Sequence, residues 1–243
     1  MKRARLVKML RSILLVMKKA RLVVMLLSIL LVTIALLRLC FRNAAQGTIA
    51  FEVAKSLLQL GVVAVVGAFV SWAMTEYQLA QSRYEYREEL LTSTLSRAVA
   101  SYSRAKRARR LLRARSGAAP GGPGLIRLDD YDRFMEMVND AQLELESLKG
   151  DVKTSEPAFA SADSVFCFFK SMEEYLGKVV KEYEMTRHTI PDSNSSVQVR
   201  QLEALSDFLG PANASLFKRE MIDPYHKVQD FIRKDLLHPK LPR

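Results

Sequence analysis

The sequence predicts an all-α protein in which N-terminal transmembrane helices are followed by a long helix and an antiparallel helical bundle. Three observations lead to this prediction. Two apolar segments of spanning length lie within residues 1–75, later segments repeat apolar residues with a period near 3.5, and no segment shows the alternation typical of a strand. A chain of 243 residues has room for a membrane region and one soluble domain.

Charge divides the chain into two unlike halves. Residues 1–116 carry 21 basic and 5 acidic groups, whereas residues 117–243 carry 16 and 21. The net charge of +11 therefore belongs to the membrane region and the helix that leaves it, and does not indicate a uniformly basic nucleic-acid-binding domain. The two cysteines, Cys40 and Cys167, are too few to predict a disulfide framework or a metal site.

A tandem repeat with a period of sixteen residues occupies the N-terminal region. Ala4–Val16 reads ARLVKMLRSILLV and recurs as ARLVVMLLSILLV at Ala20–Val32, where apolar residues replace Lys8 and Arg11. Two fewer charges turn a surface helix into one that can cross a bilayer. A recent DNA duplication would explain the repeat, and a start codon upstream of the native one would explain the presence of its first copy. We therefore assign no function to that copy.

The repeat predicts two different membrane segments. We expect residues 1–21 to form a basic amphipathic segment at the membrane surface and residues 22–41 to form a transmembrane helix. A signal peptide is the competing interpretation, because a basic start followed by an apolar run is its general shape. The run is long, however, and no small-residue cleavage site follows it.

Residues 56–75 are the stronger candidate for a transmembrane helix, because they form an uncharged stretch between Lys55 and Glu76. Trp72 lies near one end, where aromatic residues collect at membrane interfaces. Small residues recur along the segment, so one face lets another helix approach closely. We interpret this face as a contact either with a second copy of the chain or with residues 22–41 in a hairpin. Its members are Gly61, Ala64, Ala68 and Ser71.

Lysine and arginine residues near the segment ends predict the orientation in the membrane. A run of basic residues precedes the first segment, and Arg83, Arg87 and Arg97 follow the second. This distribution predicts a cytoplasmic N-terminus, a short external loop at residues 42–55 and a cytoplasmic C-terminal domain. The chain is therefore expected to be an integral membrane protein.

Residues 76–115 are predicted to form a long heptad-patterned helix, since no glycine or proline interrupts them. A Gly/Pro turn at residues 116–124 ends this helix. The apolar stripe consists of Tyr77, Tyr84, Leu91, Leu95, Ala98, Tyr102, Ala105 and Leu112, with Gln81, Glu88 and Arg109 as polar exceptions.

Residues 125–243 are predicted to form a cytoplasmic helical domain. Two helices, one from about Asp129 and one after Pro157, carry apolar residues at alternating spacings of four and three, which indicates helices packed lengthwise. The further elements expected are a loop at residues 188–196, a helix at 197–209, and a helix at 213–237 with Asn213 as N-cap and a break at Asp223–Pro224.

The densest charge lies in residues 104–115, where no acidic residue occurs. Nucleic acid would be attracted to it, but Tyr102 is the single nearby aromatic residue for base stacking. Anionic lipid would lie far away, because a straight helix carries Lys106 about 45 Å beyond Glu76, against a Debye length of about 8 Å. We favour internal pairing, because the turn would bring this basic end beside an acidic helix start. The basic cluster is Arg104, Lys106, Arg107, Arg109, Arg110, Arg113 and Arg115, and the acids are Asp129, Asp130, Asp132, Glu136 and Asp140.

The sequence gives little support for a catalytic function. His188, His226 and His238 are isolated, and the glycines of the turn at residues 116–124 lack the Lys-Ser/Thr pair of a phosphate-binding loop. We therefore expect no enzymatic activity, no cofactor and no metal.

The second membrane segment, the exit sequence Tyr77–Glu85 and the basic run Lys106–Ala114 together resemble uncharacterised bacterial membrane-anchored helical proteins. The resemblance spans about residues 50–240. It implies the same architecture at a bacterial inner membrane and adds no site. The function expected is that of a membrane-anchored interaction or scaffold protein that contacts the bilayer and either itself or another membrane protein. The alternative is a membrane-tethered binder of nucleic acid or anionic lipid through residues 104–115.

Overall fold

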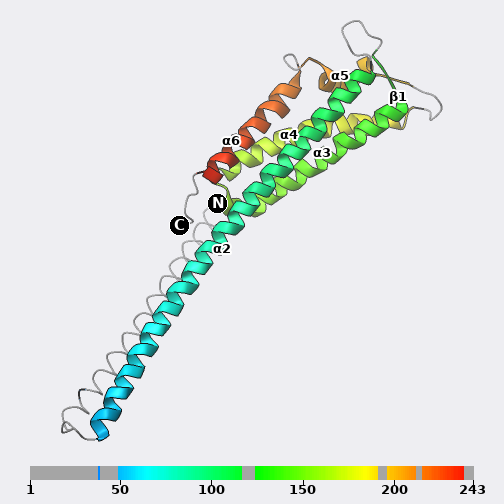
Figure 1. Cartoon of the computed structure of the whole chain (residues 1–243). Helices are drawn as coiled ribbons and strands as arrows, with labels where there is room; N and C mark the ends of the chain where they lie inside the picture. The colour runs from blue at the N-terminus through cyan, green and yellow to red at the C-terminus, as the bar shows by residue number, and fades with distance from the viewer. Residues whose placement is uncertain (1–37, 39–48, 117–123, 191–195, 212–214, 238–243) are drawn as a thin grey trace, which may run out of the picture. The chain divides into compact units, whose positions relative to one another are not determined.

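The computed structural model describes residues 38, 49–116, 124–190, 196–211 and 215–237 (Figure 1). The chain divides into two compact units, Met1–Ser82 and Arg83–Arg243. The boundary falls within one continuous helix, α2 (Ile49–Arg115). The segments expected at residues 1–21 and 22–41 lie outside the described residues, Arg38 aside.

In the first unit, α2 begins at Ile49. Residues 49–55, expected to belong to an external loop, are therefore helical. The physical reason is local: residues 49–55 contain no glycine or proline, and Glu52 lies in the first turn, where the helix dipole favours an acid. Residues 42–48 of that loop lie outside the described part of the chain.

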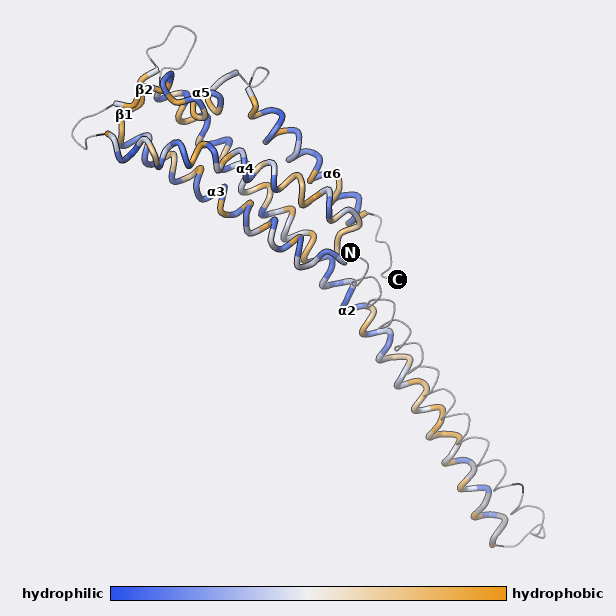
Figure 2. Tube along the Cα trace, turned by 180° about the vertical axis from the view of Figure 1, so that it is seen from behind, coloured by the Kyte–Doolittle hydropathy of each residue, from blue (hydrophilic) through white to orange (hydrophobic). Residues whose placement is uncertain are grey.

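The first-unit part of α2 consists largely of apolar residues, as the hydropathy colours of Figure 2 show. Among the described residues, one helix is long and apolar enough to cross a membrane by length and composition. None of the residues in its most apolar window is buried. A core helix of a soluble protein with this composition would be mostly buried. Large exposed residues on it include Leu57, Leu60, Val62, Val63, Val66, Phe69, Val70 and Met74.

The second unit is an antiparallel bundle of the C-terminal part of α2 with α3 (Leu128–Thr154), α4 (Ala162–Arg187) and α6 (Asp223–Leu237) (Figure 1). A short 3-10 helix, η1 (Glu156–Ala158), joins α3 to α4. Contacts fix the directions of α2 and α6, since Tyr102 stacks on Tyr225 while Arg87 reaches Asp235. An all-α class is confirmed for the described residues, with the small sheet below as its exception.

Heptad-like spacing accounts for the core of this bundle. The apolar stripe expected on α2 is buried at Leu91, Ala98, Tyr102, Ala105 and Leu112. Its first two members, Tyr77 and Tyr84, are instead exposed. The corresponding stripes on α3 and α4 are buried except at Tyr183, the last member on α4, which is half-buried. The buried members are Phe134, Val138, Ala141, Leu145, Leu148 and Val152 on α3, and Val165, Phe169, Met172, Leu176 and Val179 on α4.

A two-stranded antiparallel sheet, β1 (Leu125–Arg127) with β2 (Ser196–Gln198), corrects the expectation that no strand occurs. Each strand has three residues, too short for a visible alternation of apolar and polar residues, although Ile126 and Val197 face each other and are buried. Gly124 precedes β1 with φ of +63°, a conformation that favours glycine, and its carbonyl accepts from the Val199 N–H at 2.8 Å.

The helix expected at residues 197–209 is shorter than predicted. Its start is taken by β2 and by a 3-10 turn, η2 (Val199–Gln201), so that α5 covers only Glu203–Leu209 before Gly210. The break expected at Asp223–Pro224 corresponds to a π-helical turn, η3 (Lys218–Ile222), directly before α6. Pro224 lacks the N–H needed to continue regular α-helical bonding, which favours a wider turn before it. Asn213, expected as an N-cap, lies outside the described residues.

Candidate functional site

The basic cluster of residues 104–115 does not act as one group, because the helix distributes its side chains over several faces. Arg109 is buried, with 7% of its surface exposed. Lys106 is half-buried and its Nζ lies 5.5 Å from the centre of the Tyr102 ring. The remaining members, Arg104, Arg107, Arg110, Arg113 and Arg115, are exposed.

Arg109 binds the C-terminal end of α5. Its Nε donates to the carbonyl oxygen of Phe208 at 2.6 Å, and Nη2 donates to the carbonyl oxygen of Gly210. The guanidinium carbon lies 4.5 Å from the centre of the Phe217 ring, which adds a cation–π contact. Burial lowers the pKa of Arg109 from its usual value, and the positive charge of Arg113 acts in the same direction. The group stays charged because an arginine pKa starts so high.

The sequence favoured ion pairs between the basic cluster and the acids at the start of α3. Within the described residues, one member of the cluster forms such a pair. Arg104 lies 4.0 Å from Asp140. Asp132 instead pairs with Arg187 at 3.1 Å and accepts from the Tyr183 hydroxyl at 2.9 Å, both on α4. The prediction is wrong for Arg109, because the end of α5 offers carbonyl oxygens closer to it than any acid of α3.

Arg97, outside the predicted cluster, makes the strongest ionic contact between α2 and α3. Nε donates to Glu144 and Nη1 to Asp151, each at 2.6 Å, while Nη2 donates to Ser147 Oγ at 2.9 Å. The two carboxylates are seven residues apart on α3, so a single guanidinium bridges two turns of an acidic helix face. Hydrogen bonds to Glu144 and Asp151 raise the pKa of Arg97 against the opposing effect of burial.

Arg87 connects α2 with η1 before α4 and with the end of α6. These contacts were not predicted from the sequence. Its Nε donates to the carbonyl oxygen of Ala158 at 2.8 Å and Nη1 to that of Asp235 at 3.3 Å. The buried Asp235 carboxylate in turn accepts from the Ala160 N–H at 2.8 Å. An arginine that donates mainly to backbone carbonyls leaves no charge pattern in the sequence.

The predicted helix-packing face lies in the first unit. Gly61 is half-buried, and Ala64, Ala68 and Ser71 are exposed. The hydroxyl of Thr75, which continues the face, donates to the Ser71 carbonyl at 2.9 Å, so this polar group is satisfied within its own helix. Such a face has the small side chains that helix association in a bilayer requires.

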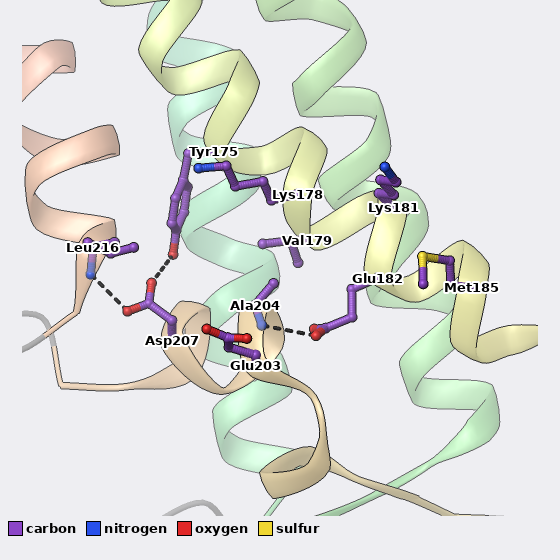
Figure 3. Close-up of a pocket in the computed structure, with 10 residues that line it drawn as sticks. All are labelled: Tyr175, Lys178, Val179, Lys181, Glu182, Met185, Glu203, Ala204, Asp207 and Leu216. Atoms are coloured by element: carbon purple, nitrogen blue, oxygen red, sulfur yellow. Dashed lines mark hydrogen bonds between the residues drawn. The ribbon is translucent and has the colours of Figure 1, made fainter.

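A pocket of about 670 Å³, unforeseen from the sequence, lies between α4 and α5 (Figure 3). Asp207 accepts from the Tyr175 hydroxyl at 3.0 Å and from the Leu216 N–H at 2.9 Å. Glu182 accepts from the backbone N–H groups of Ala204 at 3.1 Å and Leu205 at 2.7 Å, the first turn of α5. Burial raises the pKa of Tyr175 well above its usual value, and the Asp207 charge adds to this. Both acids therefore hold α5 in place.

Metal-binding geometry is absent from the described residues, where no group of three or more His, Cys, Asp or Glu side chains converges. His188 and His226 are both exposed; His188 directly follows α4, and His226 lies on α6. His238 lies outside the described part of the chain.

The chain matches no protein-family model, and neither a curated protein nor a solved structure is significantly similar to it.

Proposed function

We propose that the chain is a membrane-anchored helical interaction or scaffold protein without catalytic activity, which acts as a self-associating subunit of a membrane complex. The observation that carries this proposal is α2 itself. One continuous helix, Ile49–Arg115, contains an apolar window with no buried residue and, further along, the stripe that forms the core of the second unit. Exposing an apolar window of this length to water is strongly unfavourable in free energy.

The lipid bilayer is the partner that best covers the apolar window. A spanning helix needs about 20 predominantly apolar residues, and residues 56–75 supply an uncharged stretch of this length. Arg83, Arg87 and Arg97 follow it, which supports a cytoplasmic second unit. The small-residue face of Gly61, Ala64, Ala68 and Ser71 supports helix association within the membrane.

Membrane extraction and cross-linking of the full chain test this proposal. The chain should stay in the membrane fraction after alkaline carbonate treatment, and its C-terminal end should be protected from protease added outside intact cells. Cross-linking in the membrane should give dimers or larger species. Replacing Ala64 and Ala68 with Ile should weaken them, whereas Val63→Ile, a change outside the small-residue face, should not. Release of the chain by carbonate, or a monomer at all concentrations, would contradict the proposal.

A further inference from the structure

Exposed arginines near the end of α2 form no ion pair with the described part of the bundle. We define Arg107, Arg110 and Arg113, which follow one another at spacings of three, as the arginine face. Within the described residues, no carboxylate oxygen lies within 4.0 Å of their guanidinium nitrogens, whereas Arg97 and Arg104 on the same helix each reach acids of α3. The bundle therefore leaves the positive charge of the arginine face available to a partner.

Helix stability does not account for the whole of this face. Arg113 and Arg115 lie in the last turn of α2, where positive charge interacts favourably with the helix dipole. That effect falls off within a turn, so it does not extend to Arg107 and Arg110. Arg107, Arg110 and Arg113 also follow one another at spacings of three, at which like charges repel. Their arrangement costs stability unless negative charge comes from outside the bundle.

The surroundings of the arginine face disfavour a large polyanion. Ser101 donates to the Ala141 carbonyl at 2.8 Å and Arg104 approaches Asp140, so the N-terminal half of α3 lies beside this part of α2. That half carries the exposed acids Asp129, Glu136 and Asp140, which would repel a duplex or an anionic bilayer that covered both helices. A partner no wider than one helix avoids them.

Among the described residues, the arginine face also lacks an exposed aromatic ring on which a base could stack. The exposed neighbours on the same side of α2 are Ala100, Ser103 and Ala114, which are small and non-aromatic. Tyr102 is buried and stacks on Tyr225, with ring centroids 3.8 Å apart and planes at 9°. Single-stranded nucleic acid draws much of its affinity from exposed aromatic rings, so this face does not suit it. Small side chains do allow a second helix to approach closely.

The contact between α2 and α3 shows how this helix binds acids. Arg97 holds Glu144 and Asp151, seven residues apart on one face of α3. We propose that the arginine face binds an acidic helical segment of a partner protein in the same way, through carboxylates repeated at intervals of three, four and seven residues. This inference deepens the proposed interaction role, rests on it, and names the chemistry of the partner.

Binding of a model peptide to the full chain in nanodiscs of zwitterionic lipid tests the inference. The probe is a fluorescent alanine-based helical peptide with glutamates at those intervals, and its glutamine counterpart is the uncharged control. The glutamate peptide should bind saturably and more weakly at about 200 mM salt than at about 50 mM. The triple variant R107Q/R110Q/R113Q should weaken binding about tenfold, because three exposed ion pairs are lost and each contributes a factor of roughly two.

A charge-matched variant separates this face from general electrostatic attraction. Arg133, Lys178 and Lys181 are exposed on α3 and α4, and R133Q/K178Q/K181Q removes the same charge. This control should bind the glutamate peptide within about twofold of the unchanged chain. Equal losses in both triple variants, or no saturable binding to the unchanged chain, would overturn the inference.

Two competing polyanions complete the test. Single-stranded RNA and vesicles containing phosphatidylglycerol should bind more weakly than the glutamate peptide, and tighter binding of either through the arginine face would overturn the inference. Incorporation into nanodiscs and cross-linked dimer formation are measured on the same samples. If the chain enters the nanodisc and forms cross-linked dimers but does not bind the peptide, the inference is contradicted and the proposed function is not. If the chain fails to enter the nanodisc, the proposed function is contradicted.

Discussion

The guanidinium of Arg109 on α2 donates to the carbonyl oxygen of Gly210, the residue that ends α5. A second hydrogen bond, to the Phe208 carbonyl, places the same positive charge at the negative end of the α5 dipole. Helix α5 has only seven residues and would be marginal in isolation. Arg109 and the Glu182 carboxylate at the other end of α5 thus hold a short helix by both its termini.

Replacing Arg109 with Met should lower the free energy of unfolding of the full chain in detergent by about 2 kcal/mol, because two carbonyl groups would lose a charged donor in a buried setting. For a chain of this size the thermal midpoint should fall by about 4–8 °C. Circular dichroism during heating measures this change.

Arg110 provides the matched control for that experiment, since it is the next basic residue on the same helix and is exposed. The substitution R110M should change stability by less than about 0.5 kcal/mol. Similar losses in R109M and R110M would show that helix charge, and not the contact with α5, determines stability.

The bridge from Arg97 to Glu144 should show measurable coupling in a double-mutant cycle. Its side chains are about one-third exposed, and the Nε–Oε1 distance is 2.6 Å. We expect a coupling of about 1 kcal/mol from the unfolding free energies of R97Q, E144Q and the double variant. The exposed pair Lys170–Glu174, at 3.6 Å within α4, should give about 0.3 kcal/mol or less. A coupling for Arg97 no larger than that of the α4 pair would contradict this prediction.

Alkaline pH should destabilise the second unit through its tyrosines. Burial raises the pKa of Tyr183 to about 12, and the hydrogen bond that its hydroxyl donates to Asp132 adds to the shift. An unfolded tyrosine ionises near pH 10, so between about pH 10 and 12 the unfolded chain binds fewer protons than the folded one. The stabilisation by neutral Tyr183 is complete below about pH 10 and is lost as pH rises towards 12.

The substitution Y183F should therefore make the fall of the thermal midpoint between about pH 10 and 12 less steep, although buried Tyr131 and Tyr175, whose pKa values are also raised, keep part of it. Tyr86, which is exposed on α2, serves as the control through Y86F. A pH profile unchanged by Y183F would exclude this account of the alkaline transition.

The helices of the bundle could be predicted from the sequence because their cores follow a simple period. Residues such as Val138 and Leu145 recur on one face of α3, and this spacing is visible without knowledge of the partner helix. On α2 the same period predicted a buried stripe that begins too early in the helix. Tyr77 matches the heptad as well as Leu91 does, but it lies before the second unit and stays exposed.

The candidate sites were harder to predict because their partners are backbone atoms or distant residues. Arg109 interrupts an apolar stripe and belongs to the cluster expected to pair with acids, yet its partners are carbonyl groups of residues 99 and 101 positions away. The pocket between α4 and α5 depends on Glu182 capping α5, and no local motif signals a cap supplied from another helix.

Membrane insertion of α2 should depend on the centre of its apolar window. Val66 lies in the middle of residues 56–75 and is 55% exposed, so V66R would place a charge at the depth where a bilayer resists it most. The expected cost is about 2.5–3.5 kcal/mol, which should shift a large share of the chain from the membrane to the carbonate-soluble fraction. The substitution T75R adds the same charge next to Glu76, where a long side chain can reach the interface, and should leave the distribution nearly unchanged. If both variants stayed equally membrane-bound, residues 56–75 would not be the segment that anchors the chain.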